Sequence, residues 1–434
     1  MTNPNQNSQN KVQKIFINAF EGCGKRKLDG KRLAEYFKIN NHKLVNNPKD
    51  ADVIILITCG ASNYGALKAY KDIEHLKKFK GELIVAGCVP EIEPEEFKKH
   101  WTGKTFSTRD LEDCPEKIDK MFPGSKIKFK KIEDPNIPWR TIDTSIPKHA
   151  IKDQLIKSET TRKLYAGLYN HIFTNYFGEH YMHFGDLIKI PVKDVFQLRV
   201  SWGCSKKCSY CAIGRAIGKY RSKDFNTIMK EFKKGVKEGY TNIFLTSDDT
   251  GAYGKDFDMT FPELLREMIK IEGNYQLKLN SLNPVWIIKY IDELEKIFKS
   301  GKITSILAPI QSGNNRILKL MHRYSNRDKI IECFNRLKKA YPKLNISTQI
   351  IAGFPSETDE EFQQTLDLIK EADIDMGQIY PMSIRPNTPA VDIEPKVSEE
   401  DKLKRVRNAQ KYLNKLGYKT LLYGGGLSFG GRRK

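Results

Sequence analysis

Hydrophobic residues in the first third of the chain gather in three short runs, at residues 14–20, 52–58 and 82–86. Two stretches in which apolar residues recur at helical spacing, 31–37 and 66–79, separate these runs. Strand-like runs that alternate with amphipathic helices predict a parallel β-sheet with helices packed on its faces. The apolar face expected for the second helical stretch consists of Leu67, Tyr70, Ile73 and Leu76.

A cysteine stands just past the end of each of the three runs. These cysteines are Cys23, Cys59 and Cys88. Because parallel strands end at one edge of their sheet, where ligands also gather, we expect the three thiols to be neighbours. Three such thiolates can hold a [4Fe–4S] cluster. The alternative is three small buried core residues, since free cysteine is often buried, but the recurrence at the step that leaves the sheet favours the cluster.

Further strands are predicted at regular intervals in the second half of the chain, each followed by a helical stretch. A chain of such units forms an incomplete (β/α)6 barrel, whose active site would lie at the carboxyl ends of the strands. Asp224 is the expected N-cap of one of its helices, and Thr358 with Glu361 forms a capping box at another. The predicted fold class is therefore α/β, an N-terminal parallel-sheet domain followed by this barrel. The predicted barrel strands are 195–200, 242–246, 275–279, 303–308, 346–352 and 377–382.

A second group of cysteines lies on one short loop directly after the first barrel strand. Cys204, Cys208 and Cys211 have Cys-x-x-x-Cys-x-x-Cys spacing, and Tyr210 adds an aromatic ring inside the loop. Three thiolates at this spacing can bind three irons of a [4Fe–4S] cube and leave the fourth iron open to another ligand. A zinc site closed by a distant residue, or three thiols that only pack, are the alternatives. The strand before the loop and the helix after it favour the cluster.

The overall charge narrows the class of partner. The chain has a formal net charge of +21, which favours a polyanion such as RNA. The lysines are spread along the whole chain, however, so a compositional bias explains the excess equally well. Eight cysteines without a secretion signal favour metal or redox chemistry in a reducing, cytoplasmic compartment over disulfides. No apolar run approaches the length of a membrane span, so no membrane partner is expected.

The domain boundaries follow from these patterns. We expect a disordered lead at 1–12, an α/β domain at 13–130, a linker or insertion at 131–192, the barrel at 193–395, and a C-terminal helix with a basic, Gly-rich tail at 396–434. The insertion is dense in aromatic residues between Tyr165 and Phe184. It is interpreted as an amphipathic helix on the barrel, with a substrate-gripping aromatic segment as the alternative.

Taken together, the two cysteine groups and three further motifs resemble the radical S-adenosylmethionine (SAM) methylthiotransferases. The motifs are Pro-x-Gln-Ser-Gly at 309–313, Gly-Phe-Pro-x-Glu-Thr at 353–358 and Arg-Pro-x-Thr-Pro-Ala at 385–390. Two positions depart from the pattern of that family. Arg26 and Ile57 stand where the family usually has asparagine. The small RNA-binding TRAM domain with which the family's transfer-RNA enzymes generally close is expected to be missing from this sequence, either because the sequence is truncated or because the substrate is held differently.

The resemblance implies two [4Fe–4S] clusters, one on each cysteine group, with SAM as cosubstrate. It implies that SAM binds the open iron of the Cys204/Cys208/Cys211 cluster and that its reductive cleavage yields a 5′-deoxyadenosyl radical. The N-terminal cluster would then supply sulfur, and a second SAM the methyl group. Arg385 would orient the substrate or bridge to the N-terminal domain. The residues expected to hold SAM are Tyr210, Asp248, Ser281, Gln311, Arg323 and Ile351.

The function that follows is replacement of a C–H bond by C–S–CH3 on a tRNA base or a polypeptide residue. The expected partners are that substrate and an electron donor such as flavodoxin or ferredoxin, and the chain is expected to be a monomer. An alternative is a radical-SAM enzyme of another output, in which the N-terminal cluster only transfers electrons. A non-enzymatic RNA-binding module is a more distant alternative.

Overall fold

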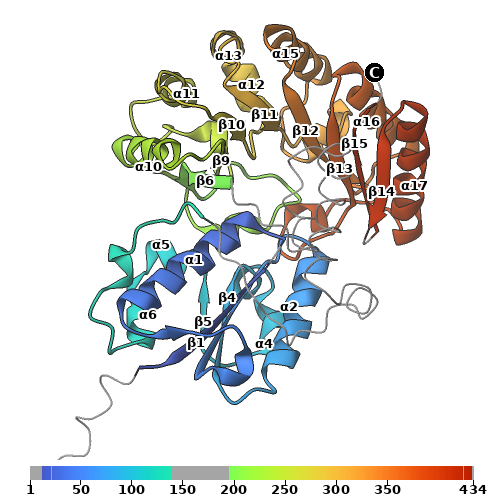
Figure 1. Cartoon of the computed structure of the whole chain (residues 1–434). Helices are drawn as coiled ribbons and strands as arrows, with labels where there is room; N and C mark the ends of the chain where they lie inside the picture. The colour runs from blue at the N-terminus through green and yellow to red at the C-terminus, as the bar shows by residue number, and fades with distance from the viewer. Residues whose placement is uncertain (1–11, 21, 138–194, 424, 433–434) are drawn as a thin grey trace, which may run out of the picture. The chain divides into compact units, whose positions relative to one another are not determined.

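The computed structural model describes residues 12–20, 22–137, 195–423 and 425–432. Its described residues divide into two compact units, which we call the N-terminal unit (12–137 with 212–218) and the barrel unit (195–211 with 219–432). Figure 1 shows the helices and strands of both. The aromatic-rich insertion predicted between Tyr165 and Phe184 lies outside the described residues, as does most of the lead at 1–12, so both assignments stay predictions.

The N-terminal unit is built on a five-stranded sheet in the order β2-β1-β3-β4-β5, in which all strands run parallel. This confirms the predicted parallel sheet, and the short edge strands β2 and β5 add to the three runs seen in the sequence. The strands are β1 (Lys14–Ala19), β2 (Lys43–Leu44), β3 (Val53–Thr58), β4 (Glu82–Gly87) and β5 (Thr105–Ser107). The helices are α1 (Gly24–Ile39), α2 (Asn63–Leu76), α3 (Val89–Ile92), α4 (Pro94–His100), α5 (Asp110–Asp113), α6 (Glu116–Met121) and, later in the chain, α9 (Ile213–Ile217).

Alternating strand residues of this sheet pack against helices on both of its faces. Ile15 and Ile17 of β1 share one cluster with apolar residues of α1, and Phe16 shares the other with those of α2 and α4. One detail of the prediction is wrong. Leu67 is 59% exposed, because α2 turns the small residues Ala66 and Ala69 toward the sheet in its place.

The barrel unit contains an eight-stranded sheet in the order β14-β15-β13-β12-β11-β10-β9-β6. The strands β6 and β9 to β13 run parallel, as predicted for an incomplete barrel. They are β6 (Val195–Arg199), β9 (Asn242–Thr246), β10 (Gln276–Leu279), β11 (Ile303–Leu307), β12 (Asn345–Ala352) and β13 (Met376–Pro381), and a separate pair is formed by β7 (Ser201–Trp202) and β8 (Arg221–Ser222). The helices are α10 (Phe225–Lys237), α11 (Phe261–Ile269), α12 (Pro284–Lys289), α13 (Ile291–Phe298), α14 (Asn315–Leu320), α15 (Arg327–Ala340), α16 (Asp359–Glu371) and α17 (Glu399–Lys415).

The segment after α17 differs from the tail predicted from its glycines and basic residues. It forms an antiparallel hairpin, β14 (Lys419–Tyr423) and β15 (Gly426–Gly430), and β15 pairs with β13 at the edge of the barrel sheet. The reason is an alternation that the glycines conceal. Leu427 and Phe429 are fully buried in the core of the barrel unit, as successive strand residues of one face are.

Local capping agrees with the sequence. The Asp224 carboxylate accepts a hydrogen bond from the Thr227 N–H at 2.8 Å at the start of α10.

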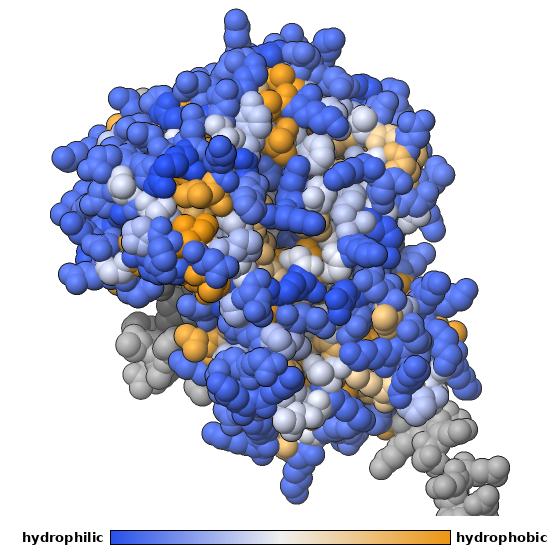
Figure 2. All heavy atoms as spheres, turned by 180° about the vertical axis from the view of Figure 1, so that it is seen from behind, coloured by the Kyte–Doolittle hydropathy of each residue, from blue (hydrophilic) through white to orange (hydrophobic). Residues whose placement is uncertain are grey.

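Cys333 is buried in the core as a small apolar residue. No helix among the described residues is long and apolar enough to cross a membrane. In the view of Figure 2, hydrophilic residues cover most of the visible surface and hydrophobic ones appear as separate small patches.

Candidate functional sites

The loop that carries Cys204, Cys208 and Cys211 is shaped by its backbone. Gly203, directly before the first cysteine, has φ +71°. A Cβ at this position would lie 2.3 Å from the carbonyl oxygen of Lys219, so a side chain here would clash as well as strain the turn. At the other end of the loop, the Cys211 N–H donates to the Cys208 carbonyl at 3.1 Å. The backbone at both ends of the loop therefore helps to set the positions of the three thiols.

Asp249 anchors this loop to the barrel, a role that was not predicted from the sequence. Its carboxylate accepts hydrogen bonds from Ser205 Oγ at 2.6 Å and from Trp286 Nε1 at 2.7 Å, and its side chain is buried. Lys206 Nζ lies 4.3 Å from the centre of the Trp286 ring. The signal in the sequence is the pair of adjacent acids shortly after β9, Asp248 and Asp249, of which Asp248 is the one predicted to bind SAM. The structure gives the structural role to its neighbour.

The environment of Cys204 is unfavourable to a bare thiolate. Burial, together with the nearby carboxylates of Asp249 and Asp248, raises the pKa of its thiol to about 12. A bound metal cluster would reverse this preference for the protonated thiol, because a coordinated thiol is deprotonated outright. The half-buried Asp248 is thus close enough to influence the first cysteine of the loop, which is compatible with its predicted place beside SAM.

Arg323 joins two parts of the same region. Its Nη1 donates to Cys208 Sγ at 3.6 Å and to Tyr210 Oη at 3.4 Å, and its Nη2 donates to the Pro309 carbonyl. Burial raises the pKa of Tyr210 well above its usual value, so this phenol stays neutral beside the arginine. Two of the predicted SAM residues, Tyr210 and Arg323, therefore meet at the second cysteine of the loop.

Ile351 belongs to an apolar cluster that also includes Tyr210. The cluster lies around the ends of β12 and β13 and around α14, and a SAM adenine would need an apolar surface of this kind. It consists of Ile317, Met321, Ile351, Phe354, Met382 and Ala390, with the partly buried Tyr210, Leu320, Ile384 and Ile393 packed against it.

Ser281 and Gln311 have unusual backbones at the ends of neighbouring strands. Their φ angles are +54° and +79°, a region that residues other than glycine rarely adopt and that clusters at functional sites. The Gln311 carbonyl accepts from the Ile351 N–H at 2.9 Å, and the Ser281 carbonyl accepts from the Thr250 N–H at 3.3 Å. Gln311 is thus fixed to β12, and Ser281 to the turn that follows β9. Arg385, the predicted catalytic residue, is 2% exposed, so protein surrounds its guanidinium.

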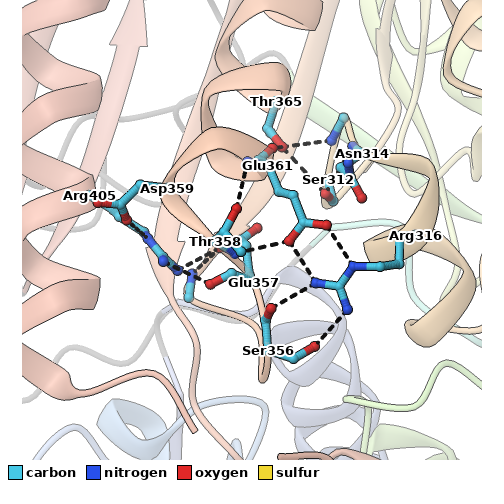
Figure 3. A network of polar contacts seen from close by, with 12 residues as sticks. Ser312, Asn314, Arg316, Ser356, Glu357, Thr358, Asp359, Glu361, Thr365 and Arg405 are labelled. Carbon is cyan, nitrogen blue, oxygen red and sulfur yellow. Dashed lines mark hydrogen bonds and ion pairs between the residues drawn. The ribbon is translucent and has the colours of Figure 1, made fainter. Parts of the chain in front are cut away.

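The motif Gly-Phe-Pro-Ser-Glu-Thr after β12 forms the polar network in Figure 3. Glu357 accepts hydrogen bonds from the Gly353 N–H at 2.6 Å and from Arg405 Nη1 of α17 at 3.1 Å. Burial outweighs these contacts and raises the pKa of Glu357 to about 7. On the other side of the loop, Arg316 Nε pairs with Glu361 at 2.6 Å, and Glu361 closes the predicted capping box with Thr358. The motif therefore fixes the loop between three helices.

The other cysteine group lies at the carboxyl edge of the N-terminal sheet. Cys23 precedes α1, Cys59 follows β3, and Cys88 precedes α3. A hydrogen bond from the Cys59 thiol, supported by the positive charges of Arg26 and Lys25, lowers the pKa of Cys23. The hydrogen bond to Cys23, burial, and the charges of Cys23 and Cys88 raise the pKa of Cys59. The fold has therefore brought three thiols, distant in sequence, into one neighbourhood.

Two features of the strand ends hold this trio in register. Gly87 has φ +101°, and a Cβ there would lie 2.3 Å from the Thr58 carbonyl oxygen. That same oxygen accepts from the Cys88 N–H at 3.1 Å. The Thr58 hydroxyl donates to the Ala86 carbonyl at 2.7 Å and accepts from the Val89 N–H at 3.3 Å. Thr58 thus joins the backbone of β3, just before Cys59, to the backbone on both sides of Cys88.

Arg26 brings a positive charge into contact with this trio. Its Nη1 donates to Cys88 Sγ at 3.4 Å and to the Thr108 hydroxyl, and its Nη2 pairs with Asp29 at 3.1 Å. Both members of the ion pair are buried, with 3% and 4% of their side chains exposed. A sequence can show that Arg26 replaces the family's usual asparagine, but the contact with Cys88 depends on the fold.

The donor sets suit iron–sulfur clusters. In the parts of the chain that the structure describes, no group of three or more His, Cys, Asp or Glu side chains is arranged to hold a metal ion. A [4Fe–4S] cube spreads its thiolates over separate irons, so its ligands need not converge on one point as those of a single ion do. Both groups supply three thiols from three cysteines and a cationic donor to one sulfur, Arg323 at Cys208 and Arg26 at Cys88.

Comparison with known protein families divides the chain in the same way. Residues 198–369 match the radical SAM superfamily, and residues 14–106 match the uncharacterized protein family UPF0004. Solved structures give the same fold at low identity. The radical SAM methyltransferase TsrM from Kitasatospora setae superposes with a TM-score of 0.57 at 10% identity, over 87% of this chain and 74% of that one.

Curated relatives extend over most of the chain. The "Probable threonylcarbamoyladenosine tRNA methylthiotransferase" of Pyrococcus horikoshii is 26% identical over 377 residues, 86% of this chain and 78% of the relative. The "tRNA-2-methylthio-N(6)-dimethylallyladenosine synthase" of Clostridium tetani is 29% identical over 427 residues, 96% and 84% of the two chains. With a radical SAM domain, a UPF0004 domain and relatives of this kind over most of its length, the chain is a radical SAM transferase similar to the tRNA methylthiotransferases.

Proposed function

We propose that the chain transfers a methylthio group to an adenosine base of tRNA, using two [4Fe–4S] clusters and SAM. The observation that carries the proposal is the meeting of Cys23, Cys59 and Cys88 at one sheet edge, because a radical SAM barrel alone has no source of sulfur. The family implies SAM and one [4Fe–4S] cluster. The second cluster is inferred from the convergence of the N-terminal thiols and the nature of their surroundings.

The residues divide into three tasks. Cys204, Cys208 and Cys211 would hold the cluster that cleaves SAM and generates the radical, and the N-terminal trio would hold the cluster that supplies sulfur. Asp248, Ser281, Gln311, Arg323 and Ile351, with Tyr210, would bind and orient SAM. Arg323 and Asp249 keep the cysteine loop in place, through Cys208 and Ser205 respectively. Arg385 would orient the substrate, one of the two roles that the sequence predicts for it; the other is a bridge to the N-terminal domain.

A tRNA substrate is favoured over a polypeptide by two observations. Relatives that match most of the chain are named for action on tRNA, and the net charge of +21 suits a polyanion. The base in both names is an adenosine that carries a further substituent, which the second name places on N6. We therefore expect the substrate to be a tRNA with such an adenosine. A methylthio product on a polypeptide instead of on tRNA would contradict this expectation.

The test combines two cysteine variants with a matched control. Anaerobically reconstituted protein is incubated with SAM, dithionite and tRNA carrying threonylcarbamoyl- or dimethylallyladenosine, and digested nucleosides are analysed by mass spectrometry. Cys208→Ala should lose both 5′-deoxyadenosine and the methylthio product. Cys59→Ala should still cleave SAM but lose the product. Cys114→Ala removes an exposed thiol and should retain both.

Iron content separates this function from its main alternative. The wild type and Cys114→Ala should each hold about eight irons, and Cys208→Ala and Cys59→Ala about four. About eight irons and SAM cleavage without a methylthio group on tRNA or peptide would instead support a radical SAM enzyme in which the N-terminal cluster transfers electrons. About four irons in both the wild type and Cys59→Ala would remove the second cluster from the proposal.

A further inference from the structure

The N-terminal cysteine trio has a buried cation whose position no motif explains. Arg26 lies on the first turns of α1, three residues after Cys23, and reaches across the sheet edge to Cys88. A buried arginine requires a counter-charge, and Asp29 supplies it from the next turn of the same helix. An ion pair that served only to stabilise α1 would have no need to include a thiol, yet this guanidinium donates to one.

The two nitrogens of the guanidinium have separate partners. Nη1 contacts Cys88 Sγ and the Thr108 hydroxyl, whereas Nη2 contacts the Asp29 carboxylate. The planar fork of arginine fixes both directions at once, which a lysine ammonium cannot do. In the Arg26–Asp29 ion pair, the guanidinium therefore faces the Cys88 thiol through Nη1, and the Asp29 carboxylate is bound at the other nitrogen, Nη2. Thr108, with its Oγ1 3.8 Å from Cys88 Sγ, lies on the same side as the thiol.

We propose that Arg26 is a positioning residue of the N-terminal cluster, which orients Cys88 and raises the reduction potential of the bound cluster. This inference rests on the proposed function, in that it requires a cluster on the three thiols. The potential of an iron–sulfur cluster depends on net charge, on hydrogen bonds to its sulfurs and on solvent exposure. A buried cation that donates to a ligand sulfur favours the reduced cluster, because reduction adds negative charge. Asp29 opposes this effect.

The expected effects of the two residues on the potential are opposite in sign. Arg26→Gln removes the positive charge and should lower the midpoint potential by about 59 mV or more, which is a tenfold change in the equilibrium constant of a one-electron couple. Asp29→Asn removes the opposing charge and should raise it. Arg26→Lys keeps the charge but loses the fork, so its potential should fall less than that of Arg26→Gln.

The measurement needs the N-terminal cluster alone in the full chain. We would replace Cys204, Cys208 and Cys211 with alanine, reconstitute the protein anaerobically, and follow the reduced cluster by electron paramagnetic resonance during a redox titration. Lys31→Gln is the matched control. It removes one positive charge from the same helix, but Lys31 pairs with Glu35 at 2.6 Å and is 26% exposed. The midpoint potential of the cluster in Lys31→Gln should equal that of the parent protein.

Each outcome of this titration has a distinct meaning. If the parent holds no iron, the second cluster of the proposed function is absent. If the parent holds about four irons and neither Arg26→Gln nor Asp29→Asn moves the potential, the cluster stands and the role of Arg26 is refuted. If Arg26→Gln loses its iron, its potential cannot be measured, and the midpoint potentials of Arg26→Lys and Asp29→Asn test the proposal instead. Opposite shifts support the proposal, whereas shifts of the same sign identify a merely structural role.

Discussion

The cysteines of the barrel unit come from one loop, residues 204–211, whereas those of the N-terminal unit come from positions 23, 59 and 88. The loop is fixed by Gly203 and by the contacts of Ser205 with Asp249. The N-terminal trio depends instead on the register of three strands, in which Ile57 pairs with both Ala19 and Ala86. Sites of similar chemistry can thus be carried by one contiguous loop or be assembled from three separate strand ends, and mutations should separate the two.

The largest expected effects come from the two glycines with positive φ. Gly203→Ala should disrupt the loop, and Gly87→Ala the step into Cys88, since each added Cβ would meet a backbone oxygen at 2.3 Å. Gly203→Ala should lose about four irons and SAM cleavage. Gly87→Ala should lose about four irons and the methylthio product while SAM cleavage remains. Iron analysis and chromatography of 5′-deoxyadenosine measure both.

Gly214→Ala serves as the control for this pair. A Cβ at Gly214 would meet nothing within 4 Å, and alanine is favoured over glycine in a helix such as α9. This variant should retain both clusters. Loss of both iron clusters in Gly87→Ala would contradict the comparison, because it would mean that the barrel loop also depends on the N-terminal sheet.

One buried carboxyl group in each unit should also respond to pH, and the two should respond in opposite directions. In the N-terminal unit, burial opposes ionisation of Asp110, but Lys117 Nζ at 2.8 Å and the Ser107 N–H at 2.7 Å prevail and lower its pKa. A lowered folded-state pKa stabilises at neutral pH, and this stability is lost as the pH falls through that pKa. In the barrel unit, burial raises the pKa of Glu357 to about 7. Its contribution is present at low pH and is lost as the pH rises through 7.

Thermal unfolding between pH 4 and pH 8 would measure this difference. Asp110→Asn should be less stable than the wild type at neutral pH, and the difference in stability should shrink as the pH falls. Glu357→Gln should gain relative stability as the pH rises, by up to roughly 3 kcal/mol, because the pKa of Glu357 rises from 4.5 to about 7. Glu360→Gln, an exposed neighbour in α16, is the control. A pH-independent difference for Glu357→Gln would refute the assignment.

Much of this arrangement could be predicted from the sequence. Strand–helix alternation places Cys23, Cys59 and Cys88 at one edge, and short-range capping signals such as Asp224 are local in the chain, so both were predicted correctly. The spacing of Cys204, Cys208 and Cys211 needs no tertiary structure to be recognised. What these cysteines bind stays a prediction.

Features set by long-range contacts could not be predicted in this way. The hairpin β14–β15 forms because β13 offers it an edge, while the glycines of its sequence indicate a tail. Helical spacing alone put Leu67 on the buried face, although the small Ala66 and Ala69 allow α2 to pack closely on the sheet. The contact of Arg26 with Cys88 joins residues 62 positions apart, and only the sheet brings them together.

The smallest expected effect concerns Thr58, which links β3 to the backbone around Cys88. Thr58→Val keeps the shape of the side chain but removes the hydroxyl that donates to the Ala86 carbonyl, a loss of about 1 kcal/mol. Thr105→Val is the matched control, since the Thr105 hydroxyl donates to the Val85 carbonyl at 2.6 Å in the same sheet. Both should unfold at slightly lower urea concentration. Only Thr58→Val should release iron faster from the N-terminal trio when a chelator is added. Equal rates of iron release from the two variants would show that the sheet as a whole, rather than this hydroxyl, fixes the register of Cys59 and Cys88.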